Sequence, residues 1–88
     1  MIAFSQLRCF VAVAEDLHFR RAAARLNMTQ PPLTRQIQML EHALGARLLD
    51  RDGRRVRLTR AGEAFLTEAR RLLTGAENAA LIARRVAR

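Results

Sequence analysis

At 88 residues with 50% hydrophobic residues, the chain has room for one small folded domain and is too apolar to be a disordered tail. Its net charge of +8 favours a polyanionic partner, with nucleic acid ahead of an anionic membrane. All 16 basic residues are arginine, which suits bidentate contacts to phosphate or guanine, although genome composition explains the missing lysine equally well. No apolar run can span a bilayer and no signal-peptide pattern is present, so we expect a cytoplasmic protein.

Two short amphipathic helices are predicted in the first third of the chain. The first covers about residues 5–16, with Ser5 as its N-cap, because apolar residues recur there at helical spacing. These are Leu7, Phe10, Val11 and Ala14. The second covers about residues 20–27. Its inward residues are Ala22, Ala23 and Leu26. The small alanines allow the close helix crossing that a helix-turn-helix requires.

A third helix is predicted after Thr29, its expected N-cap. Pro31 and Pro32 fall in its first turn, where a missing N–H costs little. Its inward stripe consists of Leu33, Ile37, Leu40 and Leu44. Gly45 stands where a left-handed C-terminal cap is expected. The second and third helices together predict a helix-turn-helix.

A short hairpin is predicted between residues 47 and 60, where arginine outnumbers acid. Leu48-Leu49 and Val56-Arg57-Leu58 flank the dipeptide Asp52-Gly53, which is favoured in hairpin turns. Two strands alone are marginally stable, so we expect this wing to pack on the helices.

Thr59 is expected to cap a long final helix that ends at about residue 86. Along it, apolar residues alternate in steps of four and three, which is heptad spacing. These residues form the heptad face: Phe65, Ala69, Leu72, Ala76, Ala79, Ala83 and Val86. The face could pack wholly on its own domain, or its distal half could pair with a second copy. We favour dimerisation, because positions beyond Gly75 extend past what three short helices can cover.

The first turns of the third helix carry polar residues suited to reading base edges. Gln30 and Thr34 lie one turn apart, so both can point outward. Glutamine can pair with adenine, threonine can meet a base or the thymine methyl, and Arg35 can grip guanine or phosphate. The candidate DNA-reading residues are Thr29, Gln30, Pro31, Pro32, Thr34 and Arg35. The alternative, an ordinary solvated face, is less favoured because a helix-turn-helix precedes this segment and an arginine-rich wing follows it.

The wing supplies further candidates for DNA contact. Arg54, beside the predicted turn, is expected to reach the minor groove or a phosphate, and Arg51 and Arg55 are expected to contact phosphates. Arginines of the second helix could meet the DNA backbone: Arg20, Arg21 and Arg25. Arg25 could equally pair with Glu41 or another acid.

The remaining conspicuous residues have structural explanations. His18 and His42 stand apart from other metal-ligating side chains, so no metal site is expected, and His18 should cap the second helix or lie on the surface. Met28 and Met39 are expected to fill gaps in the core, and Cys9 to be a buried thiol without a disulfide partner. With no nucleophile–base pair and no phosphate-binding glycine loop, we expect neither an enzyme nor a cofactor in this fragment.

The middle third of the chain carries one long motif at fixed spacing, Phe19-x-x-Ala22-Ala23-x-x-Leu26-x-x-Thr29-Gln30-Pro31-Pro32-Leu33-Thr34-x-x-Ile37-x-x-Leu40-Glu41-x-x-Leu44-Gly45-x-x-Leu48-Leu49-x-Arg51. After the wing follows Leu58-Thr59-x-Ala61-Gly62. Both resemble the LysR-type transcriptional regulators. Departures are mild: Thr29 and Thr34 stand where serine is common, and Leu49 replaces a frequent phenylalanine. The paired prolines and Arg35-Gln36-Ile37-Gln38 are most similar to members that control aromatic-compound catabolism, including catechol and chlorocatechol pathways.

The resemblance implies a mainly α fold, with a winged helix-turn-helix of three helices and a two-stranded wing at residues 1–58 and a linker or dimerisation helix at 59–88. It also implies a homodimer through the last helix, a tetramer in the full-length protein and a separate C-terminal domain that binds a small-molecule inducer. Such regulators bind and bend an interrupted palindrome. By position, the DNA-contacting residues implied are Gln30, Pro31, Pro32, Thr34, Arg35 and Arg54.

Two other functions remain open at this point. A sequence-blind architectural DNA-binding protein would bind every duplex nearly equally, whereas a regulator should discriminate by about a thousandfold or more. A helical protein–protein interaction module would use its charge on acidic partners and leave no footprint on DNA.

Overall fold

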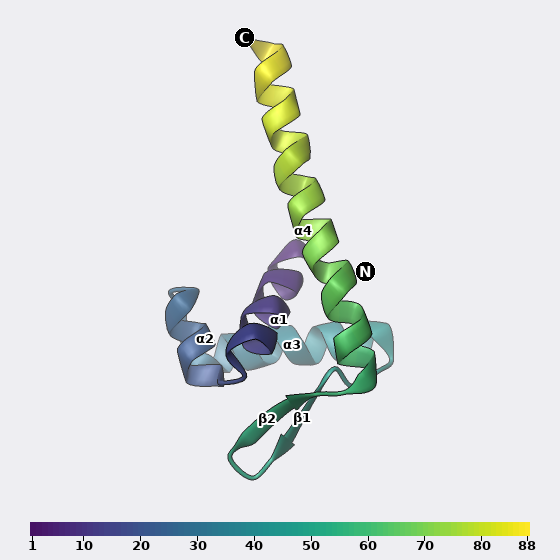
Figure 1. The fold of residues 1–88 in the computed structure, drawn as a ribbon. Helices are drawn as coiled ribbons and strands as arrows, with labels where there is room; N and C mark the ends of the chain where they lie inside the picture. Colours follow the sequence, from purple (N-terminus) through teal and green to yellow (C-terminus); the bar gives the residue numbers. More distant parts are fainter.

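Four helices and one two-stranded antiparallel sheet make up the computed structural model, which describes residues 1–88 (Figure 1). The elements are α1 (Phe4–Asp16), α2 (Phe19–Arg25), α3 (Gln30–Leu44), β1 (Leu49–Asp52), β2 (Arg55–Leu58) and α4 (Arg60–Ala87). α1 to α3 form a small body, the hairpin extends below it, and the distal half of α4 projects away from it (Figure 1). The predicted mainly α, winged architecture is confirmed.

α1 is the central helix of the core and contacts α2, α3 and α4. Phe10 is fully buried and its ring lies 5.6 Å from that of Phe65 on α4, tilted by 55°. Burial raises the pKa of the Cys9 thiol, as expected for a thiol enclosed among apolar groups. The core is therefore built around one helix that touches every other helix of the chain.

The start of α1 differs from the prediction that Ser5 caps it. Ala3 occupies the N-cap, and its backbone N–H donates to Oε1 of Gln6 at 3.0 Å. Ser5 lies inside the first turn, and its hydroxyl donates to Oε1 of Gln36 at 3.4 Å. The N-cap prediction was wrong: the helix begins before Ser5, and Gln6 satisfies the backbone N–H of the residue that occupies the N-cap.

The expected roles of His18 as a helix cap and Met28 as a core residue are confirmed. The expectation that Met39 fills a gap in the core is wrong. His18 caps α2, and its Nδ1 accepts from the backbone N–H of Arg21 at 3.1 Å. Met28 is half-buried against the core. Met39 is 49% exposed, because its position on α3 lies off the inward stripe that begins at Leu33.

The turn of the hairpin lies one residue further along the chain than the sequence suggested. Asp52 is the last residue of β1 and pairs with Arg55, so the two-residue loop is Gly53 and Arg54 rather than Asp52-Gly53. Gly53 has a φ of +62°, which glycine adopts without strain at the first loop position. Leu49 is buried in the core, so the wing packs on the helices as expected.

Hydrogen bonds between side chains and the backbone join α3, the start of β1 and α4. Oε2 of Glu41 accepts from the backbone N–H groups of Leu48 at 2.7 Å and Leu49 at 3.2 Å. Thr59 caps α4 as predicted: its hydroxyl accepts from the N–H of Gly62 at 2.9 Å and donates to the carbonyl of Arg47 at 2.6 Å. These bonds fix the direction in which α4 leaves the body.

Candidate nucleic-acid interface

The first turns of α3 lie at the surface, beside the wing (Figure 1). Gln30 and Arg35 are exposed, and Thr34 is half-buried with its side chain beside a small surface cavity. The polar face at the start of α3 is exposed because Leu33 and Ile37, on the opposite face of the helix, pack into the core. α4 packs mainly against α1, with fewer contacts to β2.

Thr29 occupies the N-cap of α3 in an extended conformation, but its side chain makes no capping hydrogen bond. A capping side chain accepts from the second or third helical N–H, and here those positions are Pro31 and Pro32. The expected cap is therefore wrong for a reason already visible in the sequence. The Thr29 hydroxyl is exposed and free to act as donor or acceptor toward a ligand.

A groove of about 540 Å³ separates the starts of α2 and α3 from the wing. His18 and Arg20 line it from one side and Gln30 lines it from α3. The wing contributes Arg51, Arg54 and Arg55. The groove thus places a predicted base-reading residue opposite the predicted phosphate-contacting arginines.

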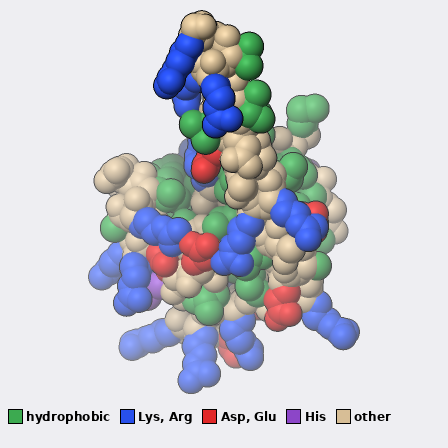
Figure 2. All heavy atoms as spheres, turned by 45° about the horizontal axis from the view of Figure 1, so that its top comes forward, with side chains coloured by type: hydrophobic (Ala, Val, Ile, Leu, Met, Phe, Trp, Pro, Cys, Tyr) green, Lys and Arg blue, Asp and Glu red, His purple; other side chains and the backbone are tan.

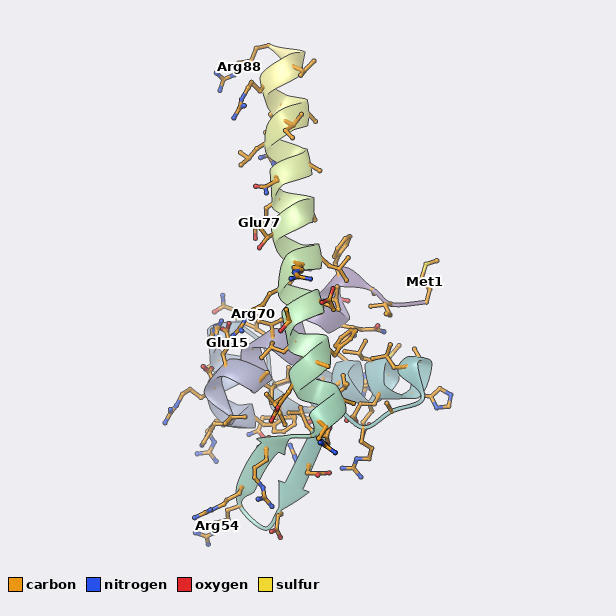
Figure 3. All side chains as sticks on the ribbon, turned by 45° about the vertical axis from the view of Figure 1, so that its right-hand side comes forward. Met1, Glu15, Arg54, Arg70, Glu77 and Arg88 are labelled. Carbon is orange, nitrogen blue, oxygen red and sulfur yellow. The ribbon has the colours of Figure 1, made fainter.

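The arginines of this groove keep their charge uncompensated. None of the six ion pairs of the protein involves Arg20, Arg51, Arg54 or Arg55, and Arg35 is equally free. Arg54 stands at the tip of the hairpin and points away from the body (Figure 3). Unpaired guanidinium groups around an open groove produce a positive field that attracts phosphates.

Arg51 is held in place by an aromatic ring that the sequence reading did not assign to the interface. Its guanidinium carbon lies 3.6 Å over the centroid of the Phe19 ring. Stacking on one face leaves the N–H groups at the edge of the guanidinium free to donate to a phosphate. A phenylalanine that opens a helix is indistinguishable from a core residue in the sequence, so no sequence signal could have found this contact.

Arg25 does not belong to this surface. It pairs with Glu15, and with Asp16 at 3.1 Å, rather than with Glu41. Glu15 also accepts from Arg70 of α4 at 3.0 Å, and Figure 3 shows the two side chains next to each other. The hydrogen bond from Arg25, together with that from Arg70, holds the pKa of the Glu15 carboxyl below its ordinary value. These pairs join α1, α2 and α4.

The heptad face of α4 divides into two parts. Ala69 is fully buried by the chain's own core, and Phe65 is half-buried with its ring against that of Phe10. Beyond them, Leu72 is 48% and Val86 78% exposed, Ala76 is half-buried, and Ala79 and Ala83 are exposed. Figure 2 shows hydrophobic side chains along one side of this projecting segment, with arginines beside them.

No group of three or more His, Cys, Asp or Glu side chains is placed to hold a metal ion. None of the helices has the length and apolarity required to cross a bilayer.

Residues 4–63 match the family described as "Bacterial regulatory helix-turn-helix protein, lysR family". The Escherichia coli regulator YnfL, itself uncharacterised, is 56% identical over 85 residues, or 97% of this chain and 29% of its own. The Hca operon transcriptional activator HcaR of Escherichia coli is 54% identical over 80 residues, 91% of this chain and 27% of its own. The chain therefore spans less than a third of the length of these curated relatives.

Among solved structures, the CbnR DBD–DNA complex has a TM-score of 0.94 and 49% identity, covering 98% of this chain and 99% of that chain. The likeness thus includes α4 as well as the winged body. Because the family match includes α1, the helix-turn-helix, the wing and the start of α4, the chain belongs to the LysR family of bacterial regulatory helix-turn-helix proteins.

Proposed function

We propose that this chain binds double-stranded DNA in a sequence-specific manner, with the start of α3 in the major groove and the wing at the adjacent minor groove. One observation carries the proposal: the exposed polar turn at Gln30 borders a groove whose arginines have no acidic partner. Because no acid neutralises them, these arginines keep their full positive charge toward a polyanion.

Each side chain has a distinct role in this proposal. Gln30 and Thr34 read base edges, and Arg35 contacts guanine or phosphate. Arg51 and Arg55 contact phosphates, which supplies affinity without sequence information. Arg54 at the wing tip enters the minor groove or contacts its phosphates.

The distal heptad face supports a homodimer as the binding unit. Its residues beyond Ala69 are the half-buried Ala76 and the exposed Leu72, Ala79, Ala83 and Val86. Small alanines allow two helices to approach closely but bury little area, so the fragment forms a weak dimer. Two copies present two α3 helices to successive major grooves, which fits an interrupted palindrome.

The relatives extend well beyond this chain, which supports its being the DNA-binding part of a longer cytoplasmic transcriptional regulator. In that longer protein we propose a tetramer and a C-terminal domain that binds a small-molecule inducer. The name of HcaR, an operon activator, supports an activating role. Control of aromatic-compound catabolism remains a prediction that rests on the short motif after the paired prolines.

Selection of bound duplexes from a random pool, read by sequencing, tests the proposal. We expect enrichment of a palindromic site, bound about a thousandfold more tightly than scrambled duplex at physiological salt. Equal binding of all duplexes would instead establish an architectural role. Absence of DNA binding at physiological salt would favour the protein–protein interaction module.

A further inference from the structure

His18 has a structural role at α2 that fixes which of its two ring nitrogens carries a proton. Its Nδ1 accepts from the backbone N–H of Arg21 at 3.1 Å. A nitrogen that accepts a hydrogen bond must offer a lone pair, so the proton of the neutral ring lies on Nε2. While His18 caps α2 in this way, the N–H group at Nε2 is the donor left free for a ligand.

The opposite edge of this ring is available to a ligand. His18 is exposed and lines the groove of about 540 Å³ between the helix-turn-helix and the wing. The charged groups that line the groove are all arginines, from α2 (Arg20), β1 (Arg51), the hairpin loop (Arg54) and β2 (Arg55). A cavity of this composition selects an anion. The neutral N–H group of His18 at its wall can donate one more hydrogen bond to that anion.

We propose that His18 is a DNA-contacting residue. The N–H group at its Nε2 donates a hydrogen bond to a phosphate oxygen of the strand held in the groove. This inference rests on the DNA binding proposed above and adds to it a neutral contact whose orientation is set by the α2 cap. The site combines side chains of α2, α3 and the wing, so it forms only when the wing is packed against the helices.

A neutral donor has a signature that separates it from the arginines. Phosphate neutralisation releases counterions, so each cationic contact steepens the dependence of the binding constant on salt. A neutral hydrogen bond raises the binding constant without releasing a counterion. His18 should therefore affect affinity and leave the salt slope unchanged, whereas Arg55 should affect both.

The test compares His18→Ser with the wild-type domain on the duplex obtained by selection, over a range of salt concentrations. Serine also caps helices but is too short to reach into the groove, so α2 should be retained, as checked by thermal unfolding. We expect binding about tenfold weaker with an unchanged salt slope. Arg55→Ala is the matched control, with a slope lower by about one.

Three outcomes separate the possibilities. If His18→Ser binds as tightly as wild type, His18 is only a cap and the inference is wrong. If the salt slope of His18→Ser is lower than that of wild type by about one, the ring is charged in the complex and the inference is also wrong. Failure of the wild-type domain to bind any duplex would overturn the proposed function itself. Nitrogen-15 NMR of the wild-type ring needs no variant: we expect Nε2 protonated and Nδ1 unprotonated, with the Nε2 proton shifted on adding duplex.

Discussion

The guanidinium of Arg51 lies 3.6 Å over the ring of Phe19, so a residue of β1 rests on the first residue of α2. Phe19 is itself 8% exposed and belongs to the core, so the wing is attached to a fixed support. Both residues line the arginine-rich groove. The position of the wing relative to the helix-turn-helix therefore depends on one cation–π pair in addition to apolar packing.

A double-mutant cycle measures this pair. Phe19→Leu keeps an apolar core residue but removes the ring face, and Arg51→Leu removes the cation. We expect a coupling energy of about 0.5–1 kcal/mol in the free energy of unfolding, measured by urea denaturation. Arg54→Leu serves as the control, because Arg54 stands at the hairpin tip and should be additive with Phe19→Leu. Full additivity of Arg51→Leu as well would show that the stacking contributes nothing to stability.

The helices were predictable because their apolar residues obey a 3.6-residue period. Leu33, Ile37 and Leu40 are buried as the period requires, and the same logic applied to Met39 would have placed it outside. The missing Thr29 cap was also readable, since the two prolines remove the amides it needs. These are local properties, which neighbouring residues determine.

Contacts between distant elements could not be predicted in this way. The partner of Arg25 depends on how α1 crosses α2, and the pairing of Glu15 with Arg70 depends on the direction of α4. The period of α4 correctly predicted an apolar face but not where the core stops covering it. On the heptad face that boundary lies between the buried Ala69 and the exposed Leu72.

The close approach of α4 to the loop before β1 makes Gly62 intolerant of a side chain. A Cβ on Gly62 would lie 2.1 Å from the backbone carbonyl oxygen of Leu48. We expect Gly62→Ala to lower the free energy of unfolding by about 1–3 kcal/mol or more, because backbone must move. Gly75→Ala is the matched control: nothing lies within 4 Å of its added Cβ. Alanine should stabilise the helix there by about 0.5–1 kcal/mol. Equal effects in urea denaturation would contradict the steric argument.

Glu15 gives the domain a dependence on acid pH. Because its folded pKa is lowered below the ordinary 4.5, mainly by the hydrogen bond from Arg25, its contribution to stability is fully present above pH 4.5. That contribution is lost as the pH falls through the folded pKa. We therefore expect Glu15→Gln to be less stable than wild type near neutral pH, by the small amount typical of exposed ion pairs. The difference should shrink on acidification below 4.5.

Glu77→Gln is the control for this pH effect, because Glu77 is exposed on α4 and forms no ion pair. Urea denaturation at a series of pH values should show a constant difference between Glu77→Gln and wild type. A constant difference for Glu15→Gln as well would mean that its carboxylate does not stabilise the fold.

The distal heptad face predicts how the dimer can be disrupted. Ala83→Glu places a carboxylate where two helices are proposed to meet, and burying it costs desolvation in both copies. We expect the dimer dissociation constant, measured by analytical ultracentrifugation, to rise about tenfold or more. Asn78→Glu adds the same charge to the same helix off the heptad face, and its dissociation constant should stay near that of wild type. Equal weakening by both variants would implicate charge alone and remove Ala83 from the interface.

Base reading and phosphate binding should separate at Gln30 and Arg55. Gln30→Ala should weaken binding to the selected duplex by about 1–3 kcal/mol and change binding to scrambled duplex little, because only a base edge is lost. Arg55→Ala should weaken both duplexes alike and lower the salt slope by about one. Fluorescence anisotropy at several salt concentrations measures both quantities. If Gln30→Ala weakened selected and scrambled duplexes equally, Gln30 would position the helix on the backbone, and Thr34 and Arg35 would have to carry the discrimination.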